Sequence, residues 1–301
     1  MKKPDISIRA REPAWASFLR AVDGLIDAAA ARAVRTTPDR GADVHFVRTT
    51  LKRLRALLRL VRPVIDETLF QRENTRLRRA ARGLGLVRDA DVAREILSKF
   101  SKSVSHEADR HAFIATVEGL AKQAEPHGEI EKAMKAAARA LGQSRRGVHR
   151  LRTAFDGWQT FEPGLRKVYA QCGKRMRAAL EGDDPAALHK WRIRVKNLCH
   201  AIEFLEPVWP RGLGREIARL RKLERKLGGD HDLVMVKNLL LKTPDAFGAE
   251  ALGRVAACLD KRSGKLRRAS KPLGEEIFKE KPVHFTSKLG LRWNDWRRAN
   301  E

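Results

Sequence analysis

A row of basic side chains lies on one face of the helix predicted over residues 43–62. His45, Arg48, Lys52 and Arg55 are spaced by three or four residues, which brings them to the same side of an α-helix. Arginine can grip phosphate oxygens with a two-pronged fork, and lysine supplies a movable point charge. The row therefore indicates binding of an anion with several charges. It continues through Arg59 and Arg62, beside an apolar arc of Val47, Leu51, Leu54, Leu58 and Val61.

The same pattern returns 144 residues later. His189, Arg192 and Lys196 repeat the spacing of the first three residues of the row, and Pro207 ends this segment as Pro63 ends the first. Solvated surface charges have no reason to keep one register in two parts of a chain. Two such rows predict a site for a long, multiply charged anion.

A second block follows each basic helix at an offset of 143 residues. Leu84-Gly85 is followed by Arg88-Asp89, and Leu227-Gly228 by His231-Asp232. We interpret each glycine as a helix C-cap and each aspartate as lying near the start of the next helix. The repeated order indicates an internal duplication, with two similar helical halves joined near residue 160.

Composition points to a helical protein with an anionic partner. The chain has 301 residues, 43% of them hydrophobic, and a formal charge of +26 that is spread over its length. The positive charges repel one another, and an anionic partner would relieve that repulsion. Nucleic acid, an anionic membrane surface, polyphosphate and an acidic protein are all possible partners. No apolar stretch is long enough to cross a bilayer, and no signal peptide precedes the first helix. We expect a cytoplasmic protein whose three cysteines stay reduced, without membrane insertion.

The periodicity predicts an all-α fold, because strand-like alternation is scarce and good helix formers dominate. We assign residues 1–160 to an N-terminal helical half, 161–270 to a C-terminal half, and 271–301 to an irregular tail. The predicted helices lie near 12–34, 43–62, 65–84, 88–102, 106–124, 129–157, 163–181, 185–206, 212–228, 231–242 and 247–270.

These motifs, in this order, resemble the CHAD domain, the conserved histidine α-helical domain. The segment Gly164-Leu165-Arg166-Lys167-Val168-Tyr169 is also similar to the opening of that family's second half. The resemblance covers roughly residues 12 to 265. It implies two pseudo-symmetric four-helix bundles around a central basic cavity, and binding of inorganic polyphosphate, with association with polyphosphate granules as a further expectation.

The second copy departs from the first. Cys199 and His200 stand where the first copy has Arg55 and Ala56, and Glu203 and Glu206 replace Arg59 and Arg62. His231 replaces Arg88. The second row is therefore shorter and partly acidic, so we expect the N-terminal row to contribute more to binding.

The candidate polyphosphate-binding residues form two groups. Each histidine has two open roles, a structural hydrogen bond or a phosphate contact, and we expect neither to bind a metal. Asp89, Asp91 and Asp232 could hold Mg²⁺ beside phosphates, although helix capping is the simpler interpretation. The first group is His45, Arg48, Lys52, Arg55, His189, Arg192 and Lys196, and the second is Arg59, Arg88, Arg166, Lys174 and Arg175.

No catalytic motif accompanies these residues. The sequence has no phosphate-binding glycine loop, no serine nucleophile elbow and no His-Glu-x-x-His. We expect a binding protein that is not an enzyme and needs no cofactor. The alternative is a DNA- or RNA-binding protein, which the net charge would suit but which lacks a recognisable nucleic-acid motif. A third interpretation is a triphosphate-processing enzyme. The sequence lacks the carboxylate cluster that such an enzyme would need.

Overall fold

The computed structural model describes residues 5–35, 40–86, 127–182, 184–241 and 249–300, with residues 95–99 and single positions between 101 and 116. The all-α prediction is confirmed, since the described residues form helices and contain no strand. None of the described helices has the length and apolar character needed to cross a membrane.

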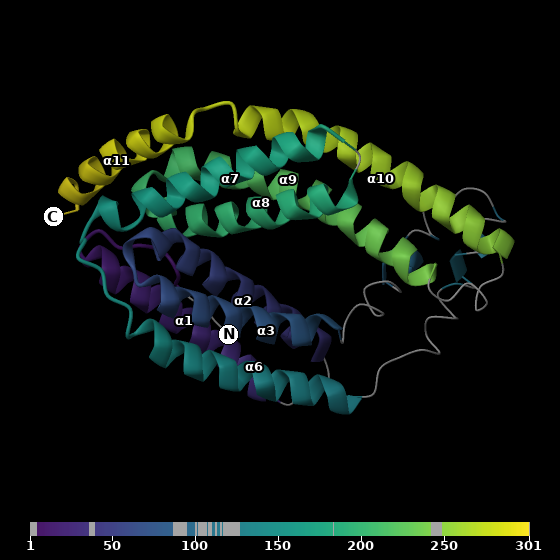
Figure 1. The fold of residues 1–301 in the computed structure, drawn as a ribbon, viewed down its shortest axis with the longest axis horizontal. Coiled ribbons are helices and arrows are strands. Elements are labelled where there is room, and N and C mark those ends of the chain that lie inside the picture. Colours follow the sequence, from purple (N-terminus) through teal and green to yellow (C-terminus); the bar gives the residue numbers. More distant parts are fainter. Residues whose placement is uncertain are drawn as a thin grey trace.

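The helices pack in two groups (Figure 1). The first contains α1 (Ala14–Val34), α2 (Arg40–Val61), α3 (Glu67–Leu86) and α6 (His127–Val148). The second contains α7 (Glu162–Leu180), α8 (Pro185–Leu205), α9 (Pro210–Leu240) and α10 (Ala249–Ile277), and α11 (Pro282–Arg298) packs on α7. A twofold rotation between the groups remains a prediction.

Helix α2 joins the groups, because it packs against both α7 and α8. The backbones of α2 and α7 approach so closely that a Cβ at Gly164 would lie 1.7 Å from the Leu60 carbonyl oxygen. Only glycine fits this crossing. The Tyr169 hydroxyl, in the same motif, donates to the Ile277 carbonyl oxygen at 2.8 Å and ties α7 to the end of α10. One hydrophobic core therefore runs through both groups.

The ends of the two basic helices agree with the sequence. Asp184 caps α8, because its carboxylate accepts from the backbone amides of Ala186 at 2.8 Å and Ala187 at 3.1 Å, and Pro185 takes the first helical position. Pro63 and Pro207 each lie in a short 3₁₀ turn directly after α2 and α8.

Two predictions about helix ends are wrong. Helix α9 runs from Pro210 to Leu240 without the break predicted at Gly228, and Gly85 is still helical in α3, which is described up to Leu86. The tail is also helical beyond residue 270. Helix α10 continues through Pro272, and α11 buries Phe285, Leu289 and Trp293.

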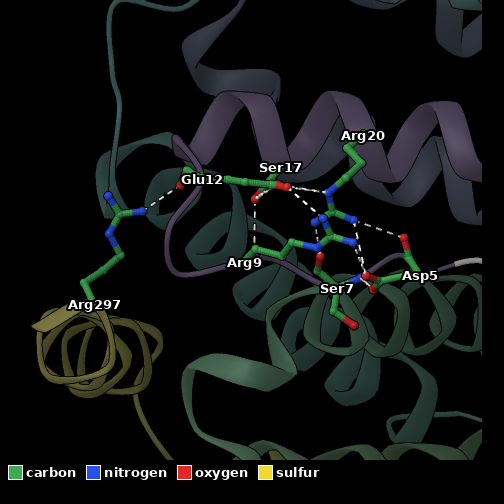
Figure 2. Close-up of polar contacts among 7 residues, drawn as sticks. All are labelled: Asp5, Ser7, Arg9, Glu12, Ser17, Arg20 and Arg297. Atoms are coloured by element: carbon green, nitrogen blue, oxygen red, sulfur yellow. Dashed lines mark hydrogen bonds and ion pairs between the residues drawn. The ribbon is translucent and has the colours of Figure 1, made fainter. Parts of the chain in front are cut away.

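Hydrogen bonds connect the N-terminal segment to helices of both groups (Figure 2). Arg20 donates to the Glu12 carboxylate at 2.9 Å, and Ser17 donates to the same carboxylate at 2.7 Å. Arg297 of α11 donates to the Glu12 carbonyl oxygen at 2.6 Å. The Ile8 amide donates to the Phe204 carbonyl oxygen at the end of α8, at 3.0 Å. These contacts attach the segment before α1 to α11 and to the end of α8.

Candidate functional site

Helices α2 and α8 turn their basic rows toward one cavity. Arg48 and Lys52 of α2, with Arg192 and Lys196 of α8, line a chamber of about 500 Å³. His45 lies at the same chamber and is exposed. The structure therefore brings together the first three residues of each row, except that His189 lines the neighbouring chamber instead. We call this space the first chamber.

A second chamber of about 360 Å³ adjoins the first, since Arg48, Lys52, Arg192, Lys196 and His231 line both. Its described lining contains eight arginine and lysine side chains and no carboxylate. We call the two chambers together the basic cavity. The residues that only the second chamber adds are Arg55, Arg59, Arg78, Ala81, Arg82, His189, Ile193 and Asn197.

Helix α3 supplies a wall of the second chamber that the sequence analysis missed. Asn74, Arg78 and Arg82 follow one another at intervals of four residues and so share one face of α3. Arg55 Nε donates to Asn74 Oδ1 at 3.1 Å, and Arg59 Nη2 donates to the same oxygen at 3.0 Å. The four-residue spacing in the sequence could have predicted that these residues share a helix face. It could not predict which helices that face of α3 packs against.

Burial and crowding of like charges lower the pKa values of basic side chains in the cavity. Burial, together with Arg48, Lys196 and Arg192, lowers the pKa of Lys52 to about 7. Burial and the neighbouring Arg55 lower the pKa of Arg59 to about 9. An entering anion would relieve this repulsion, so the cavity is electrostatically prepared for negative charge.

Two histidines meet inside the cavity. His189 Nδ1 lies 3.1 Å from His231 Nδ1, and their ring centroids are 4.3 Å apart. Burial and Arg192 lower the pKa of both rings, that of His231 to about 3. Both imidazoles are therefore mainly neutral at pH 7, and their tautomers decide which Nδ1 carries the proton. The partner of His189 is another imidazole, so both of the roles proposed for His189 remain predictions.

The two Leu-Gly glycines face the arginines of the basic rows. A Cβ at Gly85 would lie 3.2 Å from Arg48 Nη2, and one at Gly228 would lie 3.7 Å from Arg192 Nε. Gly85 thus makes room for the Arg48 guanidinium, whereas a side chain at Gly228 would meet Arg192 at an ordinary contact distance. Both glycines lie in helical backbone, so the C-cap interpretation is wrong.

The first chamber, unlike the second, is also lined by carboxylates, those of Glu95 and Asp232. Glu224 of α9 pairs with Lys196 at 2.9 Å. Asp232 lines the first chamber from the interior of α9, so the prediction that it lies near a helix start is wrong. Burial raises its pKa despite the nearby Arg192. Asp89 and Asp91, the other proposed helix caps, are outside the described residues.

Several second-group candidates do not line the cavity. Arg166 is exposed and pairs with Glu162 at 3.4 Å, and Lys174 is exposed on the same helix, α7. Arg175 lies near Arg194, on which it acts electrostatically, and lines neither chamber. Arg88 is outside the described residues. Arg59 alone of this group is placed in the cavity.

Comparison with known proteins agrees with this architecture. The sequence model of the CHAD domain matches residues 19–241. The crystal structure of the CHAD domain from the plant Ricinus communis superposes with a TM-score of 0.64 at 18% identity, covering 89% of this chain and 94% of that one. No curated protein matches the chain. Because the matched residues make up well over half of its length, the chain belongs to the CHAD domain family.

Proposed function

We propose that the protein binds inorganic polyphosphate in the basic cavity and performs no chemistry on it. One observation carries this proposal: eight cations and no carboxylate line the second chamber among the described residues. Like charges crowded into a partly buried space repel one another, which the lowered pKa values of Lys52 and Arg59 reflect. A ligand that brings its own negative charge relieves this repulsion.

The shape of the site favours a chain of phosphates. The cations come from α2, α3 and α8, so they surround an entering ligand from different sides. A phosphate chain has charge along its whole length and no bases, which suits recognition by arginine forks and lysine charges alone. Reduced access to water strengthens each contact relative to an open surface.

Nucleic acid fits the cavity less well. Proteins that bind single strands stack bases on aromatic side chains, but the described lining contains no tryptophan, tyrosine or phenylalanine. A duplex presents its phosphates on the outside of a rigid cylinder, whereas these cations line a narrow space between helices. Recruitment to polyphosphate granules in the cytoplasm is the cellular role that we propose for such binding.

A competition experiment tests the proposal. Labelled long-chain polyphosphate is bound to the protein at physiological salt and displaced with unlabelled polyphosphate, duplex DNA or single-stranded DNA at equal phosphate concentration. We expect polyphosphate to compete at least tenfold better than either DNA. Equal competition by DNA would contradict the proposal and favour a general polyanion-binding surface.

A further inference from the structure

Arg55 and Arg59 are held by an amide, where a carboxylate would be the usual partner. Asn74 Oδ1 accepts from Arg55 Nε at 3.1 Å and from Arg59 Nη2 at 3.0 Å. Arg59 Nη1 also donates to the Arg55 carbonyl oxygen at 2.7 Å. All these acceptors are neutral. Among the described residues neither arginine forms an ion pair, so both are fixed in position with their full positive charge.

A carboxylate of α8 shows the opposite arrangement. Glu203 stands 144 residues after Arg59 and pairs with Arg221 at 2.9 Å and with Arg53 at 3.6 Å. His200 Nδ1 lies 3.1 Å from the same carboxylate. There a carboxylate both positions and neutralises its cations. Neither Arg221 nor Arg53 lines the basic cavity.

From this contrast we infer that Asn74 is a positioning residue for the ligand, which orients Arg55 and Arg59 without cancelling their charge. The inference rests on the proposed function, because it assigns a role at the same site. Asparagine and aspartate have nearly the same shape. A carboxylate at this position would keep the geometry and add ion pairs, so it would compete with phosphate for the same guanidinium groups.

The substitution Asn74→Asp separates positioning from charge. We expect the variant to fold at least as stably as the wild type, because the new carboxylate meets two arginines. Its affinity for long-chain polyphosphate should nevertheless fall at least tenfold. The salt dependence should become shallower by one to two released counterions, because two cations no longer neutralise phosphates.

Two further variants complete the test. Asn294→Asp, on the exposed face of α11, adds the same single negative charge outside the basic cavity and should change affinity less than twofold. Asn74→Ala removes the acceptor without adding charge. It should weaken binding a few fold while the salt slope stays near that of the wild type.

The possible results separate the inference from the proposed function. If the wild type binds polyphosphate and Asn74→Asp behaves like Asn294→Asp, the role of Asn74 is wrong and the proposed function survives. If Asn74→Asp loses affinity with an unchanged salt slope, the substitution has disturbed the structure and the inference is again wrong. If the wild type does not bind polyphosphate, both fail.

Discussion

The guanidinium of Arg48 occupies the space that a side chain at Gly85 would need. A methyl group at that position would lie 3.2 Å from Arg48 Nη2 and 3.4 Å from Arg48 Cζ. In the other half, Gly228 faces Arg192 with more room, at 3.7 Å from Nε and 3.9 Å from Nη2. Only the Gly85 pair is tight enough for a side chain at the glycine to force its arginine to move.

Alanine substitutions should reveal this difference. Gly228→Ala places a methyl group in ordinary contact within the interior of α9, so the free energy of unfolding should rise by about 1 kcal/mol through helix propensity. Gly85→Ala places a methyl group 3.2 Å from Arg48 Nη2 and forces Arg48 to shift. Urea denaturation and polyphosphate titration measure both effects. We expect weaker binding only for Gly85→Ala, and equal binding by the two variants would contradict the role given to Gly85.

Binding should take up a proton near neutral pH. Burial, with Arg48, Lys196 and Arg192, holds the pKa of free Lys52 at about 7, and a bound polyanion raises it. The complex then holds more protons than the free protein above pH 7, so affinity falls as pH rises, by at most about tenfold per pH unit. Calorimetry with long chains in buffers of different ionisation enthalpy measures the uptake.

Lys52→Arg is the matched control for that experiment, because arginine stays charged throughout this range. Its affinity should be nearly independent of pH between 7 and 8, below the range in which Arg59, with its pKa of about 9, loses its charge. A wild type and variant with the same pH dependence would show that Lys52 is not the titrating group.

Acid should weaken the second half through Glu203. Burial raises the pKa of this carboxyl, but His200, Arg221 and Arg53 outweigh that effect and hold it at about 2, compared with 4.5 without such partners. Its stabilisation is therefore complete above pH 4.5 and is lost as pH falls through 2. The contribution is on the order of 3 kcal/mol.

The variant Glu203→Gln tests this assignment by chemical denaturation. We expect a loss of stability on the order of 3 kcal/mol at pH 7, because one partner of a buried pair is removed. The difference from the wild type should shrink between pH 4.5 and pH 2. A difference that stays constant over that range would mean that Glu203 titrates normally in the folded protein.

The sequence predicted what depends on periodicity and local signals. The helical class, the cap at Asp184 and the turns at Pro63 and Pro207 follow from neighbouring residues. The convergence of Arg48 and Lys52 with Arg192 and Lys196 was inferred from duplication, and the structure places these four residues around one chamber.

The remaining features depend on packing between distant segments. Gly228 lies inside α9 and ends no helix, and helix propensity alone cannot show this. In the sequence, Arg78 and Arg82 cannot be distinguished from ordinary surface arginines. In the structure, both line the second chamber together with residues of α2 and α8. His231 was noticed only as a replacement, and its contact with His189 requires α9 to be continuous.

The most direct test of the central claim compares two double variants that each remove two basic side chains. Arg48→Ala with Lys52→Ala removes two cations that line both chambers, whereas Lys279→Ala with Lys281→Ala removes two exposed cations between α10 and α11. Charge-assisted contacts contribute about 1.5–3 kcal/mol each, while exposed charges act through a screened field. Polyphosphate titration at physiological salt, with helicity checked by circular dichroism, should show a loss of at least about thirtyfold for the first pair and less than threefold for the second. Equal losses would mean diffuse attraction to the whole protein and would contradict a defined site in the basic cavity.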